Sequence, residues 1–465
     1  MKDDKHNRQQ LACEFIHDNY VAFNRLRFDE IAQKVQLQET DWRYITNADI
    51  NSMVCDCCAE TGANITSREI LTVLNAGSAY IPRVHPLREY ILSLRPYTPD
   101  QPDWIDWVAS QVHVVDASAT DRPKGLLERT ACCQTTMLLD RPYGAERPTN
   151  LTGEAGLTVS EAHGLTSNSS QSERSEADRL WRVCFKKWFV AMVASWMKDE
   201  VVNHQVLVLI GKQGIYKTTW LERLIPPHLR QYCCKLANST QLNKDDRLRI
   251  AEFGLINMDE LDAMTPRELN SIKSVITASD VNERAAYGYT KERRIRLASF
   301  CASSNRREFL TDITGNRRWL PFEVESIQNP FFTTLPYDLM YAQAWALAQD
   351  PTFCYWFELD EIEVLEQHNQ HFRDESNEEQ LLPILFDIPA EGKGEFMTTA
   401  QISERLVTYG NIKKPMALSR LGVVLGQYGY QPVRPRIGGV KTRGWLVYQR
   451  DTDEMNSLKR LLKDE

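Results

Sequence analysis

The sequence lacks any long hydrophobic segment: nowhere in its 465 residues do eighteen apolar residues follow one another. A helix needs about 20 such residues to cross a bilayer, so the sequence argues against a transmembrane helix. The first eight residues are polar and lack the apolar core of a secretory signal peptide. We therefore expect a cytoplasmic protein that is not attached to a membrane.

Regular cysteine spacing is also missing. The eleven cysteines include adjacent pairs and form no disulfide framework, so we expect reduced thiols. The tightest group, Cys55, Cys57 and Cys58, has no second ligand pair at zinc-finger spacing. Packing of a buried helix is therefore favoured over metal binding.

An overall positive charge is absent too. The formal net charge of −8 excludes a uniformly basic coat for nucleic acid, although local patches can still bind phosphates. The composition, 42% hydrophobic and 25% charged, is that of a soluble globular chain long enough for several domains.

The hydrophobic pattern divides the chain into five parts. We expect a helical N-terminal domain over 1–120, a flexible linker or insertion over 121–178 and an α/β domain over 179–350. A connector over 351–385 and a C-terminal domain over 386–465 follow. Apolar residues at helical spacing from Leu180 to Trp196 predict a well-buried helix.

A glycine-bearing segment follows a predicted buried strand, Val206 to Ile210. Residues 211–218 read Gly-Lys-Gln-Gly-Ile-Tyr-Lys-Thr, and a helical pattern starts after them. This order is that of a P-loop, in which backbone N–H groups and the start of a helix bind phosphate oxygens. The sequence therefore predicts a P-loop NTPase core.

The residues of this loop have distinct expected roles. Gly211 and Gly214 would let the backbone approach the phosphates, Lys217 would add charge, and the Thr218 hydroxyl would coordinate Mg²⁺. We expect ATP to be bound by the following residues: Gly211, Gln213, Gly214, Ile215, Tyr216, Lys217, Thr218, Thr219 and Asp259.

Tyr216 departs from the usual pattern, which has glycine directly before the lysine. A tyrosine can supply its backbone N–H there if its φ is negative, and its ring could pack over the base or against a neighbouring subunit. We expect this substitution to affect hydrolysis more than binding.

A second predicted strand, Gly254 to Met258, ends in Asp259 and Glu260, the form of a Walker B element. We expect Asp259 to hold Mg²⁺ together with Thr218. Glu260 would orient and activate the water that attacks the γ-phosphate.

Further candidates lie beyond a third apolar run, Ile295 to Ala302. We expect Asn305 to contact the γ-phosphate or the attacking water. Arg317 or Arg318 could act as an arginine finger from a neighbouring protomer, which requires an oligomer. A basic surface loop is the alternative for these two arginines.

The order of these elements resembles the virulence-associated protein E family of P-loop ATPases and, more distantly, the superfamily 3 helicases. The resemblance covers residues 180–350 and rests on Gly211 to Trp220, Asn257 to Leu261, Lys273 to Tyr287 and Phe300 to Phe322. It implies an AAA+/superfamily 3 helicase-like core, an oligomer such as a hexamer, and replication of a mobile genetic element. A primase would have to be a separate protein.

The segment from Arg284 to Arg318 has nine basic and three acidic residues. In superfamily 3 helicases the corresponding segment carries a hairpin that grips single-stranded DNA in a central channel. The resemblance implies that role here for five residues: Arg284, Tyr287, Lys291, Arg293 and Arg294. A solvated basic face is the alternative.

The C-terminal part predicts two helices, Met397 to Leu406 and Ala417 to Gln427, and a hairpin from Gln431 to Tyr448. This order suggests a winged-helix-like domain. From residue 405 to residue 450 there are nine Lys or Arg and no Asp or Glu. We expect duplex DNA binding through Arg420, Arg436, Lys441 and Arg443, with protein docking as the alternative.

Together these features predict an ATP-dependent DNA helicase or replication-initiation ATPase. The main alternative, which Tyr216 favours, is a nucleotide-gated switch or interference protein that binds ATP and nucleic acid without unwinding. A P-loop phosphotransferase is a third reading.

Overall fold

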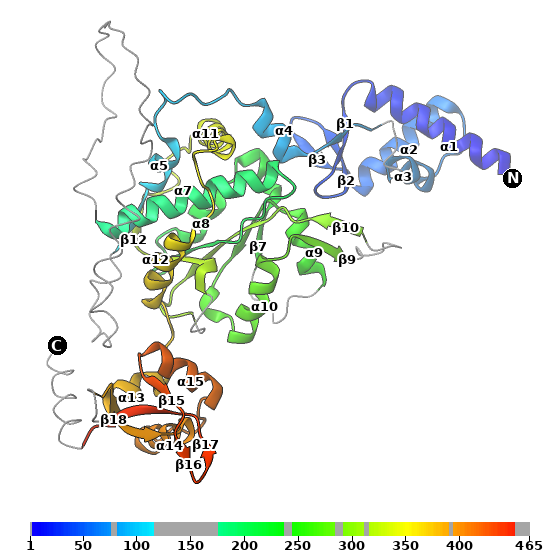
Figure 1. Ribbon diagram of the computed structural model, residues 1–465. Coiled ribbons are helices and arrows are strands. Elements are labelled where there is room, and N and C mark those ends of the chain that lie inside the picture. Colours follow the sequence, from blue (N-terminus) through cyan, green and yellow to red (C-terminus); the bar gives the residue numbers. More distant parts are fainter. Residues whose placement is uncertain are drawn as a thin grey trace, which may run out of the picture. The chain divides into compact units, whose positions relative to one another are not determined.

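Figure 1 shows the computed structural model of the chain, which describes residues 2–75, 81–115, 175–236, 244–283, 292–310, 316–389 and 394–451. The chain forms two compact units. The first comprises residues 1–112, 184–304 and 326–356, and the second comprises residues 113–183, 305–325 and 357–465. The predicted domain limits remain a prediction.

The N-terminal part of the first unit is mixed α/β, so the expectation of a helical module is wrong. Helices α1 (Lys2–Ile16), α2 (Asn47–Thr61) and α3 (Ser67–Asn75) accompany a sheet of order β3-β2-β1-β4. Its strands are β1 (Leu26–Asp29), β2 (Lys34–Gln38), β3 (Trp42–Tyr44) and β4 (Arg83–Val84). Strands this short carry too few residues for hydrophobic periodicity to distinguish them from loops.

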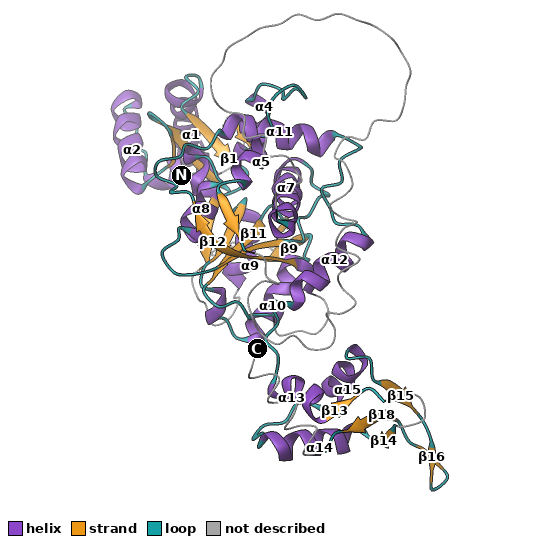
Figure 2. Cartoon of the chain, turned by 90° about the vertical axis from the view of Figure 1, so that its left-hand side faces the viewer, coloured by secondary structure: helices purple, strands orange, loops and turns teal. Residues whose placement is uncertain are grey.

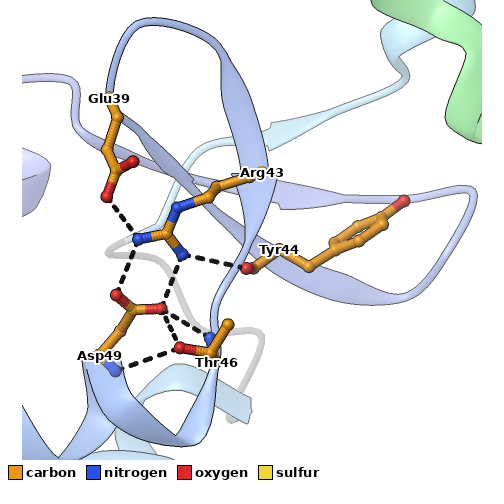
Figure 3. Close-up of polar contacts among 5 residues, drawn as sticks. All are labelled: Glu39, Arg43, Tyr44, Thr46 and Asp49. Carbon is orange, nitrogen blue, oxygen red and sulfur yellow. Dashed lines mark hydrogen bonds and ion pairs between the residues drawn. The ribbon is translucent and has the colours of Figure 1, made fainter.

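The turn from β3 into α2 is held by Arg43 (Figure 3). Its guanidinium donates to both carboxylate oxygens of Asp49, at 2.7 and 2.8 Å, and also contacts Glu39. Asp49 accepts the backbone N–H of Thr46 at 2.7 Å in the capping box that begins α2. These bonds, that from Arg43 foremost, hold the pKa of Asp49 well below its usual range.

A second carboxylate in this part, Asp29, is completely buried. It accepts the hydroxyl of Tyr44 at 2.9 Å and the hydroxyl of Tyr232 at 2.6 Å, in addition to two backbone N–H groups. Tyr232 ends the 3₁₀ helix Pro227–Tyr232, and β7 (Cys233–Leu236) begins at the next residue. Asp29 therefore joins the N-terminal sheet to the start of β7.

A parallel sheet forms the centre of the first unit. Its strands run in the order β6 (Val206–Ile210), β11 (Ser299–Ser304), β8 (Leu255–Met258) and β7. The predicted strands at Val206 and Leu255 are confirmed, and they lie in one sheet with β11 between them. Because parallel strands end at the same edge, the residues that follow β6 and β8 share that edge.

The apolar run from Ile295 to Ala302 does not form a single element. Residue 295 ends β10 (Glu292–Ile295), which pairs antiparallel with β9 (Asp280–Glu283), and β11 starts only at Ser299. Between them, the buried guanidinium of Arg296 donates to the carbonyls of Asn203 at 2.8 Å and Ala298 at 3.0 Å. This turn around a buried cation interrupts the apolar run, and burial lowers the pKa of Arg296 to about 9.

Helix α7 (Glu176–Met197) lies on this sheet (Figure 1), which confirms the predicted buried helix. The indole N–H of Trp188 donates to the carbonyl of Phe300 and that of Trp196 to the carbonyl of Gly254, each at 3.1 Å. The eight-residue spacing of these tryptophans places them on one helix face. No helix among the described residues is both long and apolar enough to cross a membrane.

The other elements of the first unit are helices. They are α4 (Pro86–Ser93), α5 (Trp104–Ala109), α8 (Lys217–Arg223), α9 (Lys244–Glu252), α10 (Pro266–Ile276) and α11 (Tyr337–Gln349).

Strand β12 (Trp319–Ile327) lies beside β5 (Val112–Val114), and residues 113–114 and 319–325 of this pair belong to the second unit. Helix α12 (Leu359–Gln370) follows along the chain. The C-terminal part contains helices α13 (Asn377–Leu385), α14 (Thr399–Gly410) and α15 (Leu418–Gln427). Its strands are β13 (Phe386–Asp387), β14 (Glu395–Met397), β15 (Gln431–Val433), β16 (Arg436–Ile437), β17 (Val440–Lys441) and β18 (Gly444–Gln449).

The two helices and the hairpin predicted for the C-terminal part are confirmed. Strands β13, β14 and β15 each pair antiparallel with β18, and the helices bury Leu406, Leu425 and Trp445 in one core. That core also includes Leu382 and Leu385 of α13, which precede the predicted domain start at residue 386. Its description as a winged helix remains a prediction.

Candidate functional site

The loop between β6 and α8 encloses the ammonium group of Lys217. Its Nζ donates to the carbonyls of Gly211 and Lys212, at 2.7 Å each, and the residue is only 7% exposed. Burial lowers the pKa of Lys217, while the carboxylates of Asp262 and Asp259 act in the opposite direction. The loop therefore holds a cation inside it, close enough to Asp259 to be influenced electrostatically.

Tyr216 does not meet the condition of a negative φ under which its backbone N–H is expected to be available. Its φ is +69°, in the left-handed region that favours glycine. An L-residue pays about 1–2 kcal/mol for this conformation. The chain thus places a tyrosine in a backbone conformation that favours glycine, and the tyrosine ring packs edge-on against Phe331 with centroids 6.2 Å apart.

Glu260, which follows β8 by one residue, also has a positive φ, at +55°; among the described non-glycine residues this is true as well of Asn24, Gln33 and Asn411, which lie elsewhere. It is exposed, whereas Asp259 before it is half-buried. Strained backbone of this kind clusters at functional sites, because surrounding structure must hold it. Two such positions, Tyr216 and Glu260, border the loop and the acidic pair.

Asp259 collects bonds from three elements of the first unit. Its Oδ1 accepts the hydroxyl of Thr218 at 2.8 Å and that of Ser303 at 2.5 Å, and its Oδ2 lies 2.6 Å from the ammonium of Lys235. Burial raises the pKa of Asp259, but the bonds from Lys235, Ser303 and Thr218 outweigh burial and leave that pKa below its usual value. The carboxylate is therefore held ionised at the C-terminal edge of the sheet.

This set of oxygens suits Mg²⁺. One carboxylate and two hydroxyls converge, and such hard oxygen donors are the ligands that Mg²⁺ prefers. Thr218 and Asp259, the two predicted metal ligands, lie within hydrogen-bond distance of each other. Their coordination of a metal stays a prediction.

The remaining predicted ATP-binding residues lie in the loop and the first turn of α8: Gln213, Gly214, Ile215 and Thr219. Gly214 has a φ of +87°, and a Cβ added there would meet no atom within 4 Å. Glycine is favoured at this position by backbone conformation alone. Nothing in these contacts tests nucleotide binding directly.

Three predicted catalytic residues belong to the second unit. Asn305 directly follows β11 and is exposed, and Arg317 and Arg318 lie in the 3₁₀ turn Asn316–Arg318. The side chain of Asn369 holds this turn by donating to the carbonyls of Asn316 at 2.9 Å and Trp319 at 3.0 Å. Their roles toward the phosphates stay predictions.

The predicted single-stranded DNA contacts fall in and beside the β9–β10 pair. Arg284, Tyr287 and Lys291 lie outside the described residues. Arg293 forms an ion pair with Asp280, and Arg294 forms one with Glu252 at 3.0 Å. This antiparallel pair lies in the segment to which the resemblance assigns DNA contacts, and DNA binding by its residues stays a prediction.

The basic residues predicted for duplex binding are all exposed: Arg420, Arg436, Lys441 and Arg443. Arg436 and Lys441 are opposite each other on β16 and β17, and Gly438 and Gly439 make the tight turn with φ of +58° and +86°. Figure 2 shows this hairpin projecting from the C-terminal part.

Sequence reasoning missed Lys235, Ser303 and Asp262. Ser303 directly follows the apolar run that ends at Ala302 and precedes the predicted Asn305. Its position at the end of β11 was therefore a signal in the sequence that could have identified it. Lys235 lies in a short strand of mixed character, Cys-Cys-Lys-Leu, which no hydrophobic pattern marks. Only the strand order places it beside Asp259.

Cys55, Cys57 and Cys58 are free thiols along α2. The preference for helix packing over metal binding by these cysteines stays a prediction. Within the described ranges, no group of three or more His, Cys, Asp or Glu side chains is placed to hold a metal ion.

Comparison with known families gives one match. Residues 162–374 match the virulence-associated protein E-like domain, a little under half of the chain. This match supports the relationship to that family which the sequence motifs indicate. A search of curated proteins finds no match to this chain.

Among solved structures, similar ones include the apo structure of the NrS-1 C terminal region (305-718), with a TM-score of 0.39 and 12% identity. The A form apo structure of the NrS-1 C terminal region-CTR gives a TM-score of 0.37, also at 12% identity. In both, the similarity covers 91% of this chain and 96% of the other. Scores this low carry no argument about the fold or function of this chain.

Proposed function

We propose that this protein is a Mg²⁺-dependent ATPase that acts on DNA, as a helicase or replication-initiation ATPase of a mobile genetic element. The observation that carries the proposal is the meeting of Asp259, Thr218 and Ser303 at the edge of a parallel sheet. Lys217, the first residue of α8, is influenced electrostatically by Asp259. The match to the virulence-associated protein E-like domain supports the same assignment.

Binding of ATP would use groups that now bond to one another. Lys217, held by two loop carbonyls, would turn its ammonium toward the β- and γ-phosphates, which carry more negative charge than a carbonyl. Thr218 and Asp259 would hold Mg²⁺, whose contribution when bound is to neutralise phosphate charge. The exposed carboxylate of Glu260 would orient the attacking water and accept its proton.

Three further residues would take part in the reaction. In the proposal, Asn305 positions the water, and Arg317 or Arg318 stabilises the charge on the γ-phosphate of a neighbouring protomer. Such an arginine finger requires a homo-oligomer, for which a hexameric ring is the expected form. Negative-stain images of the ATP-bound protein would show whether a ring forms.

DNA would bind at two places of different character. The β9–β10 hairpin would contact a single strand through backbone phosphates and stacking, with Arg293 and Arg294 exchanging Asp280 and Glu252 for phosphate. The exposed β16–β17 hairpin and α15 would contact duplex phosphates, as in a winged helix.

Steady-state hydrolysis tests the proposal. The purified protein should hydrolyse ATP only with Mg²⁺ and faster with single-stranded DNA, and Lys217→Ala should abolish hydrolysis. Lys34→Ala, at an exposed position on β2, is the matched control and should retain the full rate. Equal, DNA-independent rates in wild type and Lys217→Ala would reject the proposal.

A second candidate function is a nucleotide-gated switch that binds ATP and DNA without unwinding. The strained backbone at Tyr216 and Glu260 favours it, because strain beside the reacting groups is a feature of bistable elements. Strand displacement on a forked duplex separates the two candidates. Robust ATP-dependent unwinding eliminates the switch.

A further inference from the structure

Lys235 is a basic residue that the proposed ATPase mechanism does not use. It lies on β7, the edge strand of the parallel sheet, in register with Asn257 of β8. Its ammonium group reaches Asp259, with Nζ and Oδ2 2.6 Å apart. The lysine side chain is 49% exposed and the aspartate side chain 17%, so the cation approaches the carboxylate from the solvent side.

The two oxygens of Asp259 are occupied differently. Oδ1 accepts two hydroxyl groups, from Thr218 and Ser303, both fixed on elements of the sheet edge. Oδ2 is bonded to the one partner that can leave, because Lys235 is half-exposed and its four-carbon stem is flexible. Oδ2 is therefore the oxygen at which a metal ion and its water shell would compete with the ammonium.

A divalent cation and an ammonium group repel each other at hydrogen-bond distances, most strongly where water is partly excluded. The carboxylate of Asp259, which has limited exposure, cannot bind Mg²⁺ and the Lys235 ammonium strongly at the same time. The ion pair with Lys235 and the binding of Mg²⁺ at Asp259 are thus mutually opposed.

We propose that Lys235 is a positioning residue that holds Asp259 in the absence of metal and is displaced when Mg²⁺ and nucleotide bind. This inference rests on the proposed nucleotide site. The ion pair keeps Asp259 ionised and oriented toward Thr218 and Ser303, so the metal ligands are arranged before the metal arrives. The same ion pair sets the Mg²⁺ concentration that loading requires.

The test measures Mg²⁺ dependence of binding rather than hydrolysis. Fluorescent N-methylanthraniloyl-ADP is held below its dissociation constant and Mg²⁺ is titrated, with wild type compared with Lys235→Met. Removing a competing, half-exposed ammonium should lower the half-saturating Mg²⁺ concentration by up to about fivefold. Nucleotide affinity in excess EDTA should be unchanged, because the lysine contacts the carboxylate and not the phosphates in this mechanism.

Three controls define the result. Lys235→Arg keeps the positive charge and should retain the wild-type Mg²⁺ dependence, and Lys34→Met should not alter it. Lys235→Gln provides a second neutral variant if Lys235→Met shows a lowered thermal transition by circular dichroism.

Two outcomes overturn the inference while leaving the nucleotide site intact. One is a half-saturating Mg²⁺ concentration that stays the same or rises in both neutral variants. The other is a loss of nucleotide affinity in EDTA as large as that of Lys217→Ala, which would make Lys235 a phosphate ligand. Absence of nucleotide binding in the wild type would instead reject the proposed function, and this inference with it.

Discussion

The proposed nucleotide site and the C-terminal hairpin use positive charge in opposite ways. At the nucleotide site, Lys217 and Lys235 are bonded to specific oxygens at 2.6 to 2.7 Å. At the hairpin, Arg436 and Lys441 are exposed on two short strands joined by a two-glycine turn, and Arg443 is exposed just after the second strand.

Under the proposed function, this difference corresponds to two modes of phosphate recognition. Lys217, which is buried and bonded to two carbonyls, is held in one geometry because moving it costs hydrogen bonds that water does not replace. Exposed cations bind a polyanion through their combined field, which depends on salt and tolerates variation in position. We therefore expect single changes to be decisive at the nucleotide site and only cumulative at the hairpin.

The largest expected effect is that of Asp259→Asn. Loss of the charged metal ligand should weaken Mg²⁺-dependent nucleotide binding by about 100-fold, an effect on the order seen when metal-site ligation is disturbed. Calorimetric titration with Mg²⁺ and ADP measures it. Duplex DNA affinity should be unaltered, and a parallel loss of DNA binding would contradict the separation of the two regions.

A smaller, salt-dependent effect is expected at the hairpin. The triple variant Arg436→Ala, Lys441→Ala and Arg443→Ala should weaken duplex binding and reduce the slope of log affinity against log salt by about three, roughly one for each phosphate contact. Fluorescence anisotropy between low and physiological salt measures this slope. Thr442→Ala, a neutral change in the same hairpin, is the control. An unchanged slope would favour protein docking over DNA binding.

The smallest expected effect concerns backbone strain at Tyr216. Tyr216→Gly relieves a left-handed tyrosine, offset in part by the greater freedom of glycine in the unfolded chain, so we expect a gain of about 0.5–1 kcal/mol. Gly214→Ala is the matched opposite: its φ is +87° and its surroundings are open, so only the backbone resists, and stability should fall. Urea unfolding of both variants measures the two changes. Destabilisation by Tyr216→Gly would mean that the ring contact with Phe331 outweighs the strain.

The sequence allowed the central elements to be predicted because their residues are continuously apolar or strictly periodic. β6 is buried at every position, and α7 places Trp188 and Trp196 on one face. The Lys-Thr pair and the Asp-Glu pair were found because each directly follows such a strand or its loop. Their convergence on one sheet edge follows from parallel pairing through β11.

Other features depend on contacts that no local pattern encodes. The N-terminal strands are stabilised by neighbours far along the chain, as when Tyr232 donates to Asp29. The φ of Tyr216 is set by the loop that surrounds it and runs against the ordinary preference of tyrosine. Lys235 lies beside Asp259 only because β7 is the strand next to β8 in the sheet, and the sequence of neither strand predicts this order.

The bond from Tyr232 to Asp29 has a mechanical consequence. Tyr232 is three residues from Lys235, and a β-strand transmits displacement along its length because its backbone is nearly extended. A ligand that displaces the N-terminal sheet must either break the hydrogen bond from Tyr232 to the fully buried carboxylate of Asp29 or displace the first residue of β7 as well. A displacement of the N-terminal sheet would therefore pass through Tyr232 to β7, the strand whose Lys235 is paired with Asp259.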